Sequence, residues 1–95
     1  DKNILFIRFE DLTSNPQTEL DKIYDFFGVE RYQHDFKNIE QLTQEDDTIH
    51  GIFGDHVIRK EVKPLPPTYN HYLGEELSQN IVNSYSWFYK YFQYA

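Results

Sequence analysis

The stretch from residue 50 to residue 60 reads HGIFGDHVIRK and gathers residue types that can bind an anion. Gly51 and Gly54 would let the backbone approach a phosphate group closely, because glycine carries no side chain. Arg59 offers a planar guanidinium that matches phosphate oxygens, and Lys60 adds a second positive charge. The alternative is a glycine-containing turn in which Arg59 pairs with one of the chain's 16 carboxylates. The residues alone leave both interpretations open.

The same stretch also holds candidate metal ligands. His50, Asp55 and His56 could supply imidazole and carboxylate groups. A structural zinc site needs four ligands at compact spacing, and a catalytic site usually needs three. The two other histidines, His34 and His71, lie in unrelated segments. We therefore expect no bound metal.

Composition limits what the chain can be. Its 95 residues suit one small domain. A formal charge of −7 argues against a nucleic-acid partner, because such proteins neutralise phosphates with positive charge. The lack of cysteine excludes disulfides and thiolate metal sites. No apolar run approaches the roughly 18 residues of a membrane-spanning helix, so we expect no membrane partner.

The first part of the chain predicts a strand, a turn and a helix. Residues 3–9 contain four consecutive apolar residues, which favours a strand buried on both faces. Asn15 followed by Pro16 is typical of a helix N-terminus. The apolar positions then repeat at helical spacing as far as Phe27, and Gly28 suits the left-handed residue that ends a helix.

The rest of the chain predicts loops and one long helix. Residues 29–49 form either one short helical face or an irregular segment. Residues 50–72 read as mostly loop, with a brief extended piece at residues 57–62. From about residue 75 to residue 94 the spacing predicts one amphipathic helix with an aromatic half.

Glu10 and Asp11 follow the predicted strand directly, where ligands bind in open α/β sheets. Paired carboxylates in such a place can perform acid–base chemistry. The interpretation that we favour is structural, with Asp11 capping the next turn and Glu10 pairing with Arg8 or Arg59.

Three parts of the sequence carry a resemblance to one family. The run ILFIRFEDL at residues 4–12, followed by Asn-Pro, a helix and Gly28-Val29, resembles a late strand and helix of the PAPS-dependent sulfotransferases. The stretch at residues 50–59 is similar to the C-terminal loop of that family. The closing aromatic helix with Phe92-Gln93-Tyr94 also resembles the family's tail.

The resemblance implies an α/β fold related to nucleotide kinases. It implies transfer of a sulfuryl group from 3′-phosphoadenosine 5′-phosphosulfate (PAPS) to a hydroxyl or amine acceptor, leaving adenosine 3′,5′-bisphosphate (PAP). In that family the loop that matches residues 50–59 wraps the donor's 3′-phosphate. The resemblance therefore makes Gly51, Gly54, Arg59 and Lys60 candidates for a nucleotide lid.

The family's phosphosulfate-binding loop, a glycine-rich turn with a basic residue, has no counterpart in this sequence. A strand that is apolar on both faces also needs neighbouring strands. We therefore expect residues 1–95 to be a single C-terminal part of a P-loop-like sulfotransferase fold, mostly helical with one or two short strands. Its partner would be the remainder of the parent enzyme, and alone it would be inactive. The alternative is a non-catalytic interaction module or homodimer.

Overall fold

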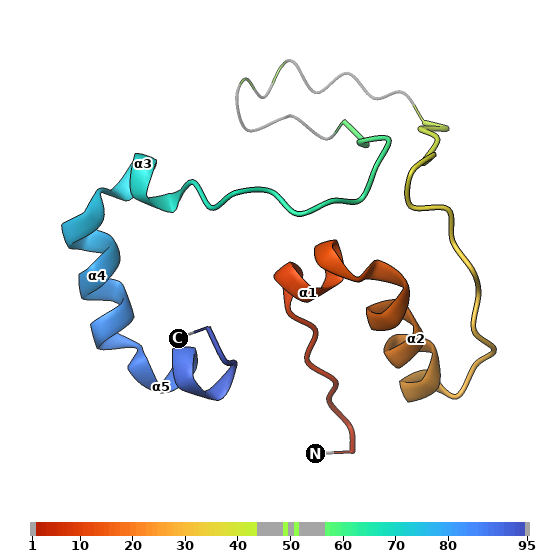
Figure 1. Ribbon diagram of the computed structural model, residues 1–95, viewed down its shortest axis with the longest axis horizontal. Coiled ribbons are helices and arrows are strands. Elements are labelled where there is room, and N and C mark those ends of the chain that lie inside the picture. The colour runs from red at the N-terminus through yellow and green to blue at the C-terminus, as the bar shows by residue number, and fades with distance from the viewer. Residues whose placement is uncertain (1, 44–48, 50, 52–56, 95) are drawn as a thin grey trace. The chain divides into compact units, whose positions relative to one another are not determined.

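The structure, a computed structural model, describes residues 2–43, 49, 51 and 57–94. The chain divides into two units, residues 1–64 and residues 65–95. Helices α1 (Phe9–Ser14) and α2 (Pro16–Phe27) belong to the first unit (Figure 1). The second unit contains α3 (Tyr69–Leu73), α4 (Glu75–Ser84) and α5 (Ser86–Tyr91).

Helix α2 confirms the predicted helix over residues 16–27. Asn15 occupies the N-cap position, although its side chain makes no capping hydrogen bond, and Pro16 is the first helical residue. Gly28 ends the helix in the left-handed region, with φ 67° and ψ 30°. Its N–H donates to the carbonyl of Asp25 at 3.1 Å, and the next N–H, of Val29, donates to that of Tyr24 at 3.0 Å. This pair of bonds is the Schellman arrangement, which satisfies carbonyls that have no partner within the helix.

The predicted strand over residues 3–9 is wrong for the described chain, which contains no strand at all. Residues 4–8 form no regular secondary structure, and Arg8 has extended dihedral angles, φ −83° and ψ 137°, before α1 begins at Phe9. An apolar run indicates burial, but a strand also requires a hydrogen-bonded neighbouring strand.

The single long helix predicted over residues 75–94 is two helices. Tyr85 separates α4 from α5 with φ −115° and ψ 34°, which lies outside the helical region. Its carbonyl accepts the N–H of Phe88 at 2.9 Å and starts α5. Aromatic residues are weaker helix formers than Leu or Ala, because packing against the preceding turn restricts their rotamers. The aromatic run that follows Tyr85 therefore does not sustain one continuous helix.

Ring packing bends the chain back after α5. The ring of Phe88 lies 4.7 Å from that of Phe92 and is stacked with that of Tyr94 at 6.1 Å between centroids. The N–H of Tyr94 donates to the carbonyl of Tyr89 at 2.8 Å, and Gln93 between them has φ 60°. This local cluster replaces the last helical turns that the sequence pattern predicts.

Helix α3 was not predicted, because residues 50–72 read as mostly loop. It follows Pro66 and Pro67, and it ends at Gly74. Gly74 has φ 76° and ψ 161°, and it also serves as the N-cap residue of α4. A helix of five residues is too short to leave a periodic apolar pattern, so its sequence signal is weak.

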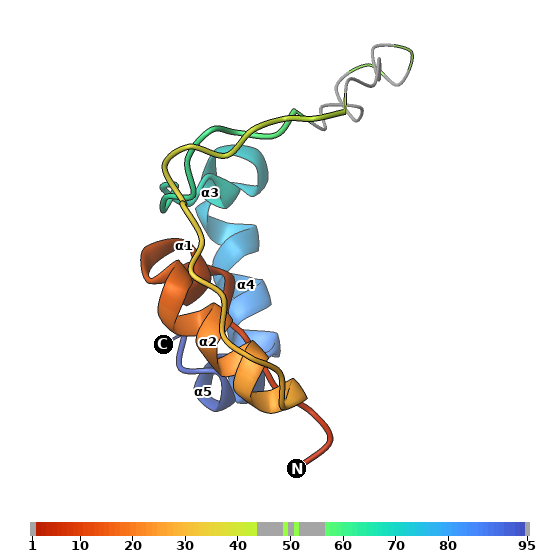
Figure 2. The ribbon, with the colours of Figure 1, turned by 90° about the vertical axis from the view of Figure 1, so that its right-hand side faces the viewer.

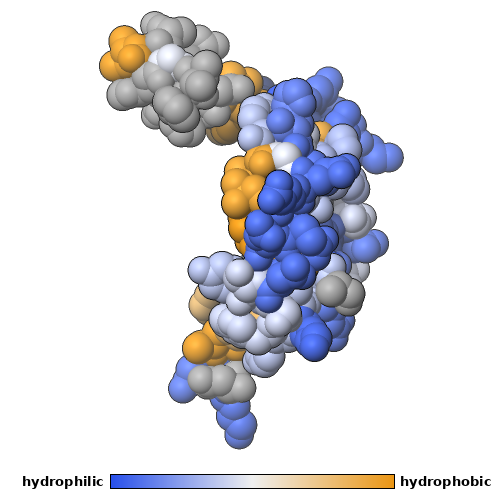
Figure 3. Space-filling model, turned by 90° about the vertical axis from the view of Figure 1, so that its left-hand side faces the viewer, coloured by the Kyte–Doolittle hydropathy of each residue, from blue (hydrophilic) through white to orange (hydrophobic). Residues whose placement is uncertain are grey.

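No apolar side chain among the described residues is buried, and the buried residues there are Glu19 and Ser78. Large apolar residues are exposed in both units, for example Phe6 at 58% and Trp87 at 65%. On the face drawn in Figure 3, apolar surface is open to solvent beside hydrophilic surface. The described structure therefore has local packing but no hydrophobic core.

Candidate functional site

The candidate site lies on two segments of the first unit that run antiparallel, which we call the arm (residues 36–41 and 58–62). The N–H of Ile39 donates to the carbonyl of Lys60, and the N–H of Val62 donates to that of Phe36, both at 2.8 Å. A third bond runs from the N–H of Ile58 to Oε1 of Gln41, at 3.2 Å. Figure 2 shows the two segments running side by side. The bonds do not form a regular strand ladder.

The arm decides between the two alternatives for its first segment: residues 36–42 are irregular and contain no helix. Residues 57–59 have no regular secondary structure, and the chain bends at Lys60 and Glu61, within the piece predicted to be extended at residues 57–62. Phe36, Ile39 and Val62 on the arm are half-buried.

Two of the four predicted site residues lie on the arm. Arg59 and Lys60 are adjacent and exposed. Gly51 belongs to the connection between the two segments; it has φ 59°, and a Cβ built on it would meet nothing within 4 Å. Gly54 lies outside the described residues. The prediction that these glycines approach a phosphate group therefore stays a prediction.

Sequence reasoning missed Lys37, which the antiparallel register brings to the same arm. With Arg59 and Lys60 it gives the arm three cations, against the carboxylates of Glu40 and Glu61. The arm is thus slightly positive in a chain whose net charge is −7. Lys37 could have been found only by pairing the apolar residues Phe36 and Ile39 with Val62. Val62 lies more than twenty residues further along the chain, and the sequence gives no direct sign of this pairing.

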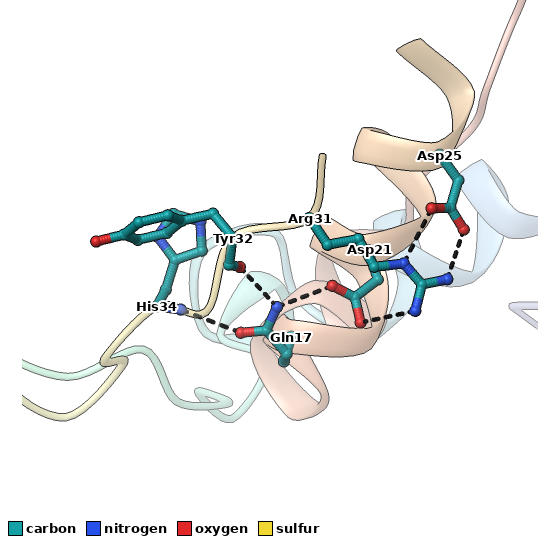
Figure 4. A network of polar contacts seen from close by, with 6 residues as sticks. All are labelled: Gln17, Asp21, Asp25, Arg31, Tyr32 and His34. Carbon is teal, nitrogen blue, oxygen red and sulfur yellow. Dashed lines mark hydrogen bonds and ion pairs between the residues drawn. The ribbon is translucent and has the colours of Figure 1, made fainter. Parts of the chain in front are cut away.

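The segment that leads from α2 to the arm is held close to the helix by the side chain of Gln17 (Figure 4). Its Nε2 donates to the carbonyl of Tyr32 at 3.0 Å and to Oδ1 of Asp21 at 2.9 Å. Its Oε1 accepts the backbone N–H of His34 at 3.2 Å. The side-chain amide of Gln17 therefore binds two backbone groups of the segment that follows α2, one carbonyl and one N–H.

Arg31 makes a second attachment of this segment to α2. Its Nε and Nη2 donate to the two carboxylate oxygens of Asp25, at 2.9 and 2.7 Å, and its Nη1 lies 3.8 Å from Oδ2 of Asp21. Hydrogen bonding to Arg31 lowers the pKa of Asp25, and the same bond raises the pKa of Arg31. Two-point contact of this kind fixes the orientation of the guanidinium as well as its position.

Aromatic rings complete the attachment around His34. The His34 ring is stacked with Tyr24 at 6.0 Å between centroids and meets Tyr32 edge to face at 4.8 Å. The Tyr24 hydroxyl is hydrogen-bonded to Nε2 of His34. Beyond this point, Asp35 accepts the N–H of Lys37 at 3.1 Å and the amide of Asn38 at 3.0 Å. The bond from Asn38, followed by that from Lys37, lowers the pKa of Asp35.

Asp11 forms an ion pair with Arg8, a partner that we expected for Glu10: Arg8 Nε lies 3.4 Å from Oδ2 of Asp11. The predicted role of Glu10 stays a prediction. The carbonyl of Asp11 accepts the N–H of Asn15 at 2.8 Å, between α1 and α2. These contacts connect the extended segment to the first two helices.

No group of three or more His, Asp or Glu residues capable of holding a metal occurs in the part of the chain that the structure describes. His50, Asp55 and His56 fall outside that part, so the metal interpretation of this stretch is not tested. None of the helices in the described ranges is long and apolar enough to span a bilayer.

Comparison with known families identifies the class of protein. The model of the Sulfotransferase domain family matches residues 1–89, nearly the whole chain. The chain therefore belongs to the sulfotransferase family, whose reaction is the transfer of a sulfuryl group. No curated protein and no solved structure matches the chain.

Proposed function

We propose that this chain supplies part of the donor-nucleotide site of a PAPS-dependent sulfotransferase, with Arg59 binding the 3′-phosphate. The observation that supports it most is the exposed pair Arg59 and Lys60 on a hydrogen-bonded arm, within a chain that matches the family over residues 1–89. A guanidinium beside an ammonium suits the oxygens of a phosphate monoester.

The contribution of Arg59 to the reaction would be positioning. During sulfuryl transfer, the acceptor oxygen or nitrogen forms a bond to sulfur while the bond from sulfur to the bridging phosphate oxygen breaks. The bisphosphate leaves with that electron pair, and the acceptor loses its proton to a base. The 3′-phosphate is remote from the sulfur, so its contact with Arg59 would fix the register of the donor without touching the reacting atoms. We assign no catalytic base to this chain.

We further propose that the chain works as the C-terminal part of a larger α/β enzyme, whose remainder supplies the phosphosulfate-binding loop. Two features support this proposal. Residues 4–8 carry an apolar run but form no strand among the described residues, and no described apolar side chain is buried. A neighbouring strand from the rest of the enzyme would cover exposed side chains such as Phe6.

A second candidate function is a non-catalytic interaction or dimerisation module. The same exposed apolar residues favour it, because large exposed apolar surfaces often mark interaction sites. The two functions differ in one direct respect. A homodimer needs only a second copy of this chain, whereas the enzyme needs a phosphosulfate-binding loop and a nucleotide.

The test is titration calorimetry of the intact enzyme with PAP. We expect Arg59→Ala to weaken binding by about 1.5–3 kcal/mol, the contribution of a hydrogen bond to a charged group. Lys90→Ala removes the same charge from α5 and is the matched control, for which we expect little change. Equal affinities of the wild type and Arg59→Ala would refute the assignment of Arg59.

A further inference from the structure

The backbone on either side of Arg59 is hydrogen-bonded to the same opposing segment. On the preceding side, the N–H of Ile58 donates to Oε1 of Gln41 at 3.2 Å. On the following side, the carbonyl of Lys60 accepts the N–H of Ile39 at 2.8 Å. Arg59 therefore lies between two residues, Ile58 and Lys60, whose backbone groups are hydrogen-bonded to the opposing segment.

The two contacts differ in kind. The bond between Ile39 and Lys60 joins backbone groups, so it depends on the path of the chain more than on residue type. The bond at Ile58 depends on the side-chain amide of Gln41, so it depends on residue type. Gln41 is exposed, and its Oε1 accepts this backbone N–H.

We infer that Gln41 is a positioning residue for Arg59, an inference that rests on the proposed function. By holding the Ile58 N–H, Gln41 restricts the backbone that carries the guanidinium before any ligand arrives. A binding group that is already ordered loses less conformational entropy on binding, and the affinity rises accordingly. Gln41 itself need not touch the nucleotide.

The experiment is titration of the intact enzyme with PAP for a set of matched variants. Gln41→Met keeps the length of the side chain but removes the acceptor of the Ile58 N–H. We expect it to weaken binding by about two- to tenfold, the equivalent of one ordinary hydrogen bond. Gln79→Met is the control, because Gln79 is an exposed glutamine on α4 whose amide donates to Asn83 at 3.0 Å. We expect its affinity to equal that of the wild type.

A double-mutant cycle separates positioning from a general loss of structure. If Gln41 acts through Arg59, adding Gln41→Met to Arg59→Ala causes no further loss of affinity. An equal loss in both backgrounds, or no loss in either, would overturn the role of Gln41. When Arg59→Ala weakens binding and Gln41→Met does not, the proposed function stands and only this inference fails. Unchanged affinity of Arg59→Ala would instead refute the proposed function, and the role of Gln41 with it.

Discussion

Arg31 and Asp25 form the best-defined polar contact of the first unit, through two hydrogen bonds of 2.9 and 2.7 Å. The bond from Arg31 holds the pKa of Asp25 below its ordinary value of about 3.9. A carboxylate whose pKa is lowered by folding stabilises the folded state above its unfolded-state pKa. That stabilisation is lost as the pH falls through the lower, folded-state pKa. We therefore expect this contact to persist at neutral and mildly acidic pH and to weaken only below about pH 4.

The measurement is an NMR titration of the carboxyl carbons. Replacing Arg31 with Gln should raise the pKa of Asp25 toward its ordinary value, because the hydrogen bond from Arg31 is the largest cause of the lowered pKa. Asp35 is the internal control: its pKa is lowered by Asn38 and Lys37, so the substitution should leave it unchanged. A pKa of Asp25 that is the same in the wild type and in Arg31→Gln would contradict the expectation.

Residue type alone indicated part of the candidate site. Arg59 and Lys60 could be singled out because few side chains bind phosphate well, and the structure places both on an exposed arm. Lys37 and Gln41 could not be singled out from residue type, because their relevance depends on the pairing of their segment with residues some twenty positions away. Such a register is set by backbone bonds, which any residue type except proline can make.

At the scale of elements, single residues at the ends of α2 predicted its bounds correctly, whereas apolar patterns over many residues predicted a strand and a long helix that the described part of the chain does not contain. Pro16 at the first position and Gly28 just past the end bounded α2 correctly, because each acts through its own backbone geometry. The long helix predicted from residue 75 is divided at Tyr85. The apolar spacing did not reveal this break, because a periodic apolar stripe can continue on the same face across it. The strand prediction failed for a related reason: an apolar run indicates burial but supplies no partner.

The two glycines with positive φ at helix ends differ in what they tolerate. Gly28 lies in the left-handed region at φ 67° and ψ 30°, which other residues can enter at a cost of about 1–2 kcal/mol. Gly74, at φ 76° and ψ 161°, lies where essentially only glycine is found, with a cost of about 1–3 kcal/mol. A Cβ at either position would meet nothing within 4 Å, so the cost comes from the backbone.

We therefore expect Gly74→Ala to lower the free energy of unfolding more than Gly28→Ala does, as measured by urea unfolding of the intact protein. Asparagine provides the matched comparison, because it enters the left-handed region more readily than alanine. Gly28→Asn should recover part of the stability that Gly28→Ala loses, whereas Gly74→Asn should recover none. Equal losses at the two glycines would show that the backbone geometry at Gly74 relaxes easily.

At the scale of the molecule, the sequence carries apolar residues that the described structure does not bury. Side chains such as Leu5, Phe27 and Trp87 are at least 36% exposed, and α1 and α2 enclose no buried apolar residue. Burial of apolar area is the dominant favourable contribution to folding, and it must offset about 1–2 kcal/mol of backbone entropy for each ordered residue. Hydrogen bonds and ion pairs on the surface contribute too little to replace it.

We expect the isolated 95-residue chain to unfold in urea without a cooperative transition and to bind a hydrophobic dye such as ANS. Within the proposed intact enzyme, the same residues should unfold cooperatively and exclude the dye, because the rest of the proposed α/β fold would cover them. Repeating the urea titration at two chain concentrations a hundredfold apart distinguishes the alternative module. A homodimer would show a cooperative transition whose midpoint rises with concentration. A cooperative transition independent of concentration, with a slope of about 1–3 kcal/mol per molar urea, would mean that the chain forms its own core as a monomer. The proposal that it is one part of a larger enzyme would then be wrong.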